Sequence, residues 1–452
     1  YAENFTLDSL GTKKLLVVPI NFVDYQCQTY ELCDVVHSQL EDAFFGEPAD
    51  TGWQSVASFY NKSSYGKLTI EGVVTPFYEA TYTMEEFANL DRTTGIYGQY
   101  FDPTWQMVED VVAWYKTYTG TNLDEYDQDN DGFIDAVYMI YMNPNMSSRL
   151  YSDPAQQDVF WAYMFSDYDN YYSADVESPV PFTYAWSSRD FMYEGYGFES
   201  IDAHTYIHEM GHVLGLDDYY TYDDDDWGGL GGLDMMDNNI LDHNAYSKFF
   251  YGWAEPIVID GTKGVTEIVL TPFEKDGKFI LINNDWNGTA FDEYLALEFY
   301  TPTGLNYKDS ITGPYPGNNL KGFTEPGIKL LHVDARLGNY NYETGEFIGY
   351  TDLVDNGPNT YPYIAMSNTA SRSQNPDYKL VHLLEENRMF TFELNGVANN
   401  NTLFQKGSYF TPERYDHFFP ENGVFNDGSE IGYRIEIVDM SATQATIQIH
   451  RL

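Results

Sequence analysis

Two histidines and a glutamate at helical spacing are the residues of this chain with the clearest chemistry. His208, Glu209 and His212 form a His-Glu-x-x-His sequence. On a helix, residues four apart lie on one face, so both imidazoles can bind one Zn²⁺. Glu209, offset by about 100°, can reach a water at the metal. This spacing predicts metal-assisted hydrolysis in which Glu209 is the general base.

Gly215 and Asp218 extend this motif beyond the helix. A glycine three residues after His212 can adopt a positive φ, end the helix and turn the chain back toward the metal. Asp218 then arrives in a ligand position. The resulting HExxHxxGxxD pattern is similar to that of metzincins, with Asp in place of the more usual third His. We therefore expect His208, His212 and Asp218 to hold catalytic zinc.

The choice of the third ligand depends on which acidic residues follow the helix. A distant Glu is the competing design, yet no Glu occurs between Glu209 and Glu255. This favours Asp218, and Asp217 and His243 stay open as alternatives. His204, one turn before the motif, is expected to support the ligands or to lie on the surface.

Metzincins also have a methionine in a tight turn beneath the zinc. Gly231 and Gly232 are followed by Met235 and Met236 shortly after the expected helix. We assign the structural turn methionine to Met236, and ordinary core filling is the alternative.

Beyond these motifs, the chain resembles the immune inhibitor A family of secreted bacterial zinc metallopeptidases, from about residue 12 to its end. Before the helix, the resemblance rests on residues 16–24 (LVVPINFVD) and 58–68 (SFYNKSSYGKL). After the helix it rests on residues 234–236 (DMM), 246–253 (YSKFFYGW), 292–298 (DEYLALE) and 327–334 (GIKLLHVD). The resemblance implies a secreted zinc endopeptidase.

A second constellation in residues 127–135 (DQDNDGFID) is typical of a calcium loop. Its carboxylates at positions 1, 3, 5 and 9 belong to Asp127, Asp129, Asp131 and Asp135. Gly132 permits a sharp turn, and the Phe133 carbonyl is a further expected ligand. Position 12 is Tyr138 rather than Glu, and residues 136–141 read as a buried strand. We therefore expect structural Ca²⁺ in a loop outside an EF-hand, with a solvated Asp/Asn turn as the alternative.

Composition excludes several classes of partner. The chain has 452 residues, with 70 acidic against 23 basic residues and a net charge of −47. Such charge argues against binding to nucleic acid or to an anionic membrane. No stretch approaches the roughly 20 apolar residues of a membrane span. We expect a soluble, monomeric protein whose partner is a protein or peptide substrate.

Cysteine usage points to an oxidising compartment. Cys27 and Cys33 are the only cysteines, and a pair so close can form a small-loop disulfide. Two free thiols, or one thiol bound to zinc in a latent form, are the alternatives. The sequence begins at Tyr1 without Met or a signal peptide, so any targeting or inhibitory segment is expected to be removed or to lie outside it. Together with the resemblance, this predicts a secreted, extracellular protein.

The pattern of apolar residues predicts an α+β protein with two domains. Apolar strands alternate with helical patterns in residues 15–141, and residues 105–115 have helical spacing. We expect a metzincin-like zinc-peptidase catalytic domain, a mixed sheet with an active-site helix, in residues 1–256. A β-rich, sandwich-like domain with a long loop at 301–326 is expected in residues 257–452. Its expected strands are 266–270, 278–282, 294–300, 328–333, 378–384, 390–394, 433–438 and 445–450.

A function from another class fits part of the same pattern. The Tyr-, Asn- and Asp-rich composition and the β-rich region are compatible with a calcium-stabilised extracellular adhesion or glycan-binding protein that carries a peptidase-like domain. Loss of Glu209 or of a motif histidine would mark such a protein. All of these residues are present, which favours the endopeptidase.

Overall fold

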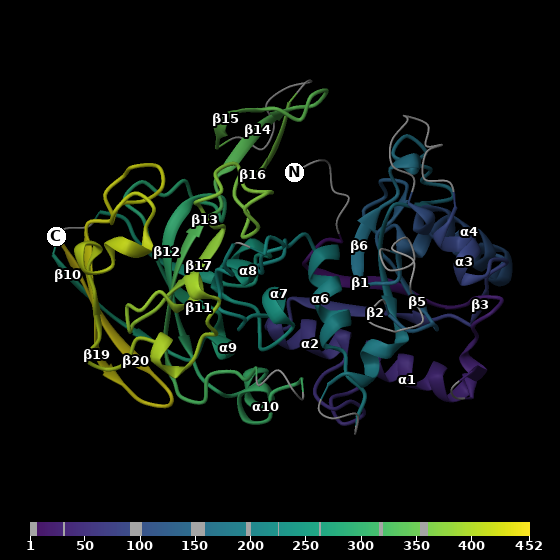
Figure 1. Ribbon diagram of the computed structural model, residues 1–452, viewed down its shortest axis with the longest axis horizontal. Coiled ribbons are helices and arrows are strands. Elements are labelled where there is room, and N and C mark those ends of the chain that lie inside the picture. The colour runs from purple at the N-terminus through teal and green to yellow at the C-terminus, as the bar shows by residue number, and fades with distance from the viewer. Residues whose placement is uncertain are drawn as a thin grey trace. The chain divides into compact units, whose positions relative to one another are not determined.

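The computed structural model shows a mixed α+β protein with several sheets (Figure 1). It describes residues 7–29, 32–90, 102–145, 159–195, 200–224, 226–261, 264–315, 320–352 and 360–452. The predicted α+β class is confirmed at this level. Within these ranges, no helix combines the length and the apolar character needed to cross a membrane.

Packing divides the described chain into two compact units. We call residues 7–61 and 66–216 the N-terminal unit, and residues 62–65 and 217–452 the C-terminal unit. The predicted boundary between a catalytic and a β-rich domain after residue 256 is a functional division, and it stays a prediction.

The N-terminal unit is built on a six-stranded sheet with the order β2-β1-β5-β8-β6, in which β3 also pairs with β1. All pairings are parallel except that between β6 and β8. The strands are β1 (Gly11–Asn21), β2 (Leu68–Val74), β3 (Tyr78–Glu79), β5 (Val137–Tyr141), β6 (Tyr163–Ser166) and β8 (Thr183–Ser188). Strand β5 confirms the buried strand predicted at 136–141. A separate parallel pair consists of β4 (Phe133–Ile134) and β7 (Val180–Pro181).

Helices cover both faces of this sheet. They are α1 (Cys33–Phe45), α2 (Val56–Ser63), α3 (Met84–Ala88), α4 (Pro103–Thr119) and α6 (His204–Val213). Helix α4 confirms the helical spacing seen at 105–115, and it packs with alternate residues of β1 and β5 in one core. On the opposite face, Phe44 of α1 and Tyr206 of α6 contact Tyr138 of β5, with ring centroids 4.8 Å and 5.8 Å from its ring. The central strands are therefore buried on both sides, as a parallel sheet requires.

The 3₁₀ segments are short and lie in connections. They are η1 (Cys27–Thr29), η2 (Asp124–Tyr126), η3 (Tyr168–Asn170), η4 (Arg189–Tyr193), η6 (Thr391–Leu394), η7 (Asn400–Thr402), η8 (Pro412–Arg414) and η9 (Asp416–Phe418). A disulfide joins Cys27 in η1 to Cys33 at the start of α1, with Cα atoms 5.2 Å apart. The disulfide prediction is confirmed, and both alternatives with free thiols are wrong.

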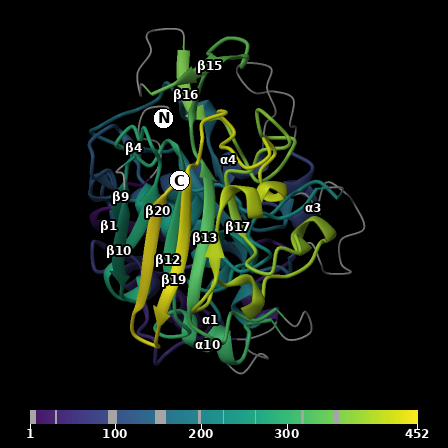
Figure 2. The same cartoon turned by 90° about the vertical axis from the view of Figure 1, so that its left-hand side faces the viewer.

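The C-terminal unit contains two sheets that share one core. One sheet has the order β17-β13-β12-β11-β9, and the other has the order β10-β20-β19-β18. Apolar residues of both sheets meet in a single buried cluster, and Figure 2 shows β10, β19 and β20 in front of β12, β13 and β17. The strands are β9 (Glu255–Ile259), β10 (Val265–Leu270), β11 (Lys278–Ile282), β12 (Glu293–Tyr300), β13 (Gly327–Asp334), β17 (Val381–Leu384), β18 (Tyr409–Phe410), β19 (Tyr433–Met440) and β20 (Ala445–Arg451).

Smaller elements complete this unit. A three-stranded sheet consists of β14 (Leu337–Asn341), β15 (Phe347–Thr351) and β16 (Thr360–Ile364). The helices are α7 (Met235–Asn238), α8 (Ala245–Phe250), α9 (Phe273–Asp276) and α10 (Asn306–Ile311). Two predictions are corrected here: the strand expected at 390–394 is η6, and the loop expected at 301–326 contains α10.

Candidate metal centre

Helix α6 carries the histidine motif and is buried along nearly its whole length. Its first N–H group, at His204, donates to the Asp202 carboxylate at 3.1 Å, which satisfies a donor that a helix start leaves unpaired. Farther along, the Tyr60 hydroxyl donates to the carbonyl of Ile207 at 2.7 Å. These contacts fix the helix within the N-terminal unit.

The helix ends as the sequence predicts. Gly215 has a φ of 102°, a conformation that favours glycine. The Gly215 N–H donates to His212 O at 2.8 Å, and the Leu216 N–H donates to Gly211 O at 3.0 Å. This pair of hydrogen bonds is a Schellman motif. The prediction that Gly215 ends the helix with a positive φ is confirmed.

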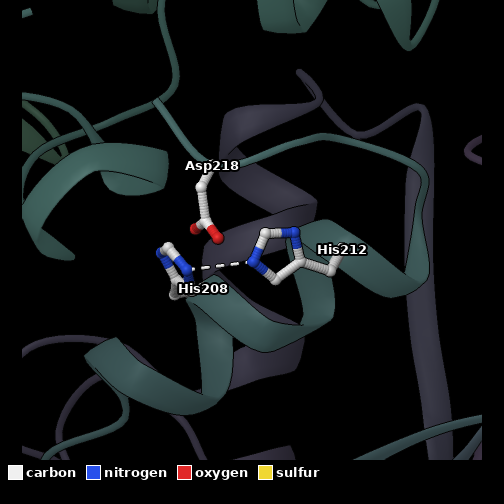
Figure 3. Close-up of side chains that lie close together, drawn as sticks. All are labelled: His208, His212 and Asp218. Carbon is white, nitrogen blue, oxygen red and sulfur yellow. Dashed lines mark hydrogen bonds between the residues drawn. The ribbon is translucent and has the colours of Figure 1, made fainter. Parts of the chain in front are cut away.

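The structure brings His208, His212 and Asp218 together. Each offers one ligand atom, and these atoms lie within 4.8 Å of one another (Figure 3). The Nε2 atoms of the two histidines face each other at 3.1 Å. Zn–N bonds of about 2.0–2.1 Å in tetrahedral geometry place two ligand nitrogens about 3.3 Å apart. The two imidazoles are thus spaced as a shared metal ion requires, and the donor set fits zinc.

His212 is held by the turn that follows it. Its Nδ1 lies 2.8 Å from the carbonyl oxygen of Leu216, so Nδ1 carries the hydrogen and Nε2 offers its lone pair to a metal. Hydrogen bonding of the second ring nitrogen is the usual way in which proteins orient a metal-binding histidine. The positive φ of Gly215 brings this carbonyl back over the helix end.

Glu209 lies on α6 outside the group of possible ligands, and only 5% of it is exposed. The charge of Glu209 interacts with two buried phenols, those of Tyr60 and Tyr138. Burial raises the pKa of Tyr60 and the pKa of Tyr138 far above the usual value, and the negative charge of Glu209 raises both further. Both phenols therefore stay neutral in the working pH range. An acidic side chain that is buried beside the motif histidines is placed to handle a proton.

The alternative third ligands lie elsewhere. The Asp217 carboxylate accepts a hydrogen bond from Ser367 Oγ at 2.9 Å and pairs with Arg372 at 3.6 Å. His243 is buried, and its ring lies 5.8 Å from that of Tyr251. Among the described residues, neither Asp217 nor His243 belongs to the possible metal group.

His204 has a role that the sequence did not reveal. It is fully buried rather than on the surface, and its ring stacks on Trp53 with centroids 4.1 Å apart. Its Nδ1 lies 2.5 Å from Asp202. His204 thus anchors the start of the motif helix, and it is not part of the metal group formed by described residues.

Met236 is fully buried near the start of α7. The expected turn is present at Gly231 and Gly232, whose φ values are 61° and 84°, but both methionines lie in the short helix that follows. Asp234 caps this helix by accepting from the Met236 N–H at 3.0 Å. The Met236 carbonyl accepts from the N–H of Tyr219 at 2.7 Å, so its backbone supports the residue next to Asp218.

The acidic loop after η2 forms a second group. Asp127, Asp129 and Asp135 each offer an oxygen within 4.8 Å of the others. Asp131 is outside this group, and its carboxylate accepts from the Phe133 N–H at 2.8 Å. Phe133 itself begins β4. The structure thus brings three of the four predicted carboxylates together, and Asn130 and Gly132 make the turn with positive φ values of 61° and 90°.

Two carboxylates of this loop, those of Asp131 and Asp135, have raised pKa values. Burial raises the pKa of Asp135 to about 7, and the charges of Asp129 and Asp127 add to the rise. Burial raises the pKa of Asp131 to about 6, again with help from Asp129 and Asp127. Oxygen ligands crowded in this way suit a hard divalent cation such as Ca²⁺.

Sequence reasoning missed Tyr222, which contacts Asp218, and Arg372, which contacts Tyr222. The Tyr222 hydroxyl donates a hydrogen bond to Asp218, and the Arg372 guanidinium carbon lies 4.5 Å from the centroid of the Tyr222 ring. Tyr222 lay within reach of a sequence-based search, because it follows Asp218 by four residues. Arg372 lay beyond it, because no local pattern connects positions 150 residues apart.

No family model matches this chain, and no curated protein matches it.

Proposed function

We propose that this protein is a secreted zinc endopeptidase of the immune inhibitor A type. His208, His212 and Asp218 would hold the metal, and Glu209 would be the general base. The observation that carries the proposal is the convergence of two facing imidazole nitrogens, 3.1 Å apart, with a carboxylate oxygen. Bound zinc would polarise the scissile carbonyl and lower the pKa of the attacking water.

Glu209 and the Leu216 carbonyl have different roles in the proposed reaction. Glu209 takes a proton from water and returns it to the leaving amine, so its carboxylate must stay free of metal coordination. Its position outside the ligand group supports this role. The Leu216 carbonyl keeps His212 in one tautomer by accepting from Nδ1, so the metal-facing nitrogen needs no rearrangement before it binds.

Two further features support the extracellular location that we propose. The disulfide between Cys27 and Cys33 is of the kind that persists in oxidising compartments, which fits an extracellular protein. The group formed by Asp127, Asp129 and Asp135 fits a structural Ca²⁺ ion, which fits a calcium-rich medium. We propose a peptide or protein substrate.

The test compares Glu209→Ala with Asp218→Ala. Glu209→Ala should abolish peptide hydrolysis while about one zinc per chain stays bound, because it removes a base and no ligand. Asp218→Ala should lower zinc affinity and activity together. Asp217→Ala, the matched control at the adjacent position, should do markedly less.

Metal analysis beside an assay on a mixed peptide library decides between the outcomes. Activity of Glu209→Ala within tenfold of the parent would overturn the assigned base. A parent that binds zinc and hydrolyses no peptide would instead favour the adhesion or glycan-binding alternative.

A further inference from the structure

The side chain of Tyr222 lies at the carboxylate of Asp218. Its hydroxyl donates a hydrogen bond to Asp218 Oδ2. A carboxylate has two oxygens, and a donor on Oδ2 leaves Oδ1 with its lone pairs for another partner. The phenol therefore distinguishes the two oxygens of the residue that we propose as the third ligand.

Arg372 packs over the face of the Tyr222 ring. Its guanidinium carbon lies 4.5 Å from the ring centroid, within the range of a cation–π contact. The same guanidinium pairs with Asp217 at 3.6 Å, and 56% of the Arg372 side chain is exposed. One arginine thus contacts both the residue before Asp218 and the phenol that binds Asp218.

The chain around Arg372 also fixes the backbone of the Asp218 loop. Asn368 Nδ2 donates to Tyr219 O at 2.9 Å, and Thr369 Oγ1 donates to Tyr220 O at 3.2 Å. The Tyr222 N–H donates to Thr369 Oγ1 at 3.3 Å. Asn368 is fully buried. Residues 367–372 therefore act as a clasp on residues 217–222, and both segments belong to the C-terminal unit.

We propose that Tyr222 is a positioning residue for the third metal ligand and that Arg372 positions Tyr222. The phenol holds Asp218 Oδ2 so that Oδ1 is presented to the metal. This inference rests on the proposed function, because it gives Asp218 the role of zinc ligand. Tyr222 acts through Asp218 and takes no proton from substrate.

The physical reason is the freedom of an aspartate side chain. Without a partner, the Asp218 carboxylate can rotate about two bonds, and that freedom would be lost each time it binds metal. A hydrogen bond already made before binding removes part of this cost. Outer partners of metal ligands commonly change metal affinity or activity by about 10- to 100-fold when they are removed.

The first experiment removes only the phenol oxygen. Tyr222→Phe should weaken zinc binding by about 10- to 100-fold, measured by competition with a chromophoric chelator. It should also change the visible absorption of the Co²⁺-substituted protein, since the geometry of the carboxylate ligand changes. The matched control is Tyr378→Phe, because Tyr378 also donates to a carboxylate, that of Glu421 at 2.7 Å, outside the clasp.

The second experiment tests Arg372. Arg372→Ala should weaken zinc binding by about two- to fivefold, the effect expected of an exposed cation–π contact. Arg434→Ala is the matched control, because Arg434 lies 4.2 Å from the ring centroid of Tyr409 and pairs with Glu436 at 3.0 Å. It should leave zinc affinity unchanged.

A double variant shows whether Tyr222 acts through Asp218. In an Asp218→Ala background, Tyr222→Phe should cause no further loss of zinc affinity. An equal loss in both backgrounds would overturn the inference, and so would an unchanged zinc affinity and Co²⁺ spectrum in Tyr222→Phe. Failure of the proposed function looks different, because Glu209→Ala would then stay active or the parent would bind no zinc.

Discussion

The acidic loop offers the sharpest quantitative test of how metal binding stabilises this protein. Oxygens of Asp127, Asp129 and Asp135 lie within 4.8 Å of one another. Two unit charges at that distance repel by roughly 3 kcal/mol at an effective dielectric of 20, and the exposure of Asp129 reduces its share. Without a cation, the folded state relieves part of this repulsion by protonating Asp135, whose pKa is raised to about 7, and carries the remainder. The unfolded chain relieves it by separating the carboxylates. We therefore expect Ca²⁺ to raise the free energy of unfolding.

The size of the effect follows from mass action. Ca²⁺ that binds only the folded protein adds about 2.7 kcal/mol when its free concentration is a hundredfold above Kd. For a folding unit of 150–250 residues, each kcal/mol shifts Tm by about 2–4 °C, so a rise of roughly 5–11 °C is expected. The assay is thermal unfolding of protein that is stripped of metal on a chelating resin, reloaded with one zinc per chain and then titrated with Ca²⁺.

Two variants assign the response to the loop. Asp129→Asn/Asp135→Asn should lose most of the rise in Tm. Asp124→Asn, a nearby acidic residue outside the group of carboxylates, should keep it. An equal rise in the parent and in the double variant would refute the reasoning. Asp131→Asn tests the fourth carboxylate. Full loss of the response would return Asp131 to the ligand set that the sequence predicts, and a retained response would keep it outside that set.

Two further predictions concern a buried carboxyl and the end of the motif helix. Burial raises the pKa of Glu194 from 4.5 to about 7, with the charges of Asp202 and Asp190 adding to it. The folded state therefore binds this proton more tightly than the unfolded state, and stability should fall as pH rises from about 4.5 to 7. Urea unfolding across this range should show a weaker fall in Glu194→Gln, and an unchanged slope would contradict the assignment. Gly215→Ala should cost about 1–2 kcal/mol of stability, because φ is 102°, and should also weaken zinc binding through His212. Gly120→Ala, with a φ of 71° and no atom within 4 Å of the new Cβ, should show the stability cost alone, and equal zinc affinities in the two variants would contradict the role of the turn.

Local patterns predicted those parts of the molecule whose causes are local. Helical spacing identified α4, a glycine after the motif identified the end of α6, and a run of apolar residues identified β5. Cysteines six positions apart identified the disulfide. In each case the physical reason lies within a few residues of sequence, where periodicity and backbone preference act.

The errors arose where distant contacts or competing local preferences decide the structure. Residues 390–394 have strand-like composition, yet they form η6, and Glu385 accepts hydrogen bonds from both Thr391 and Phe392. Helix α10 formed in a segment whose Gly- and Asn-rich flanks suggested a loop. The clasp on the Asp218 loop joins positions 149 residues apart, such as Tyr219 and Asn368. No periodicity could have indicated that contact.

The clasp also sets the order in which the proposed centre can mature during synthesis. A ribosome adds about 5–20 residues per second, so the 149 residues from Tyr219 to Asn368 take roughly 7–30 s. During that interval the nascent chain has both motif histidines, but the loop that carries Asp218 has none of its partners from residues 367–372. A zinc ion that arrived then would meet an Asp218 carboxylate without the partners that orient it. Full metal affinity would therefore come late, when most of the chain has been made and folded.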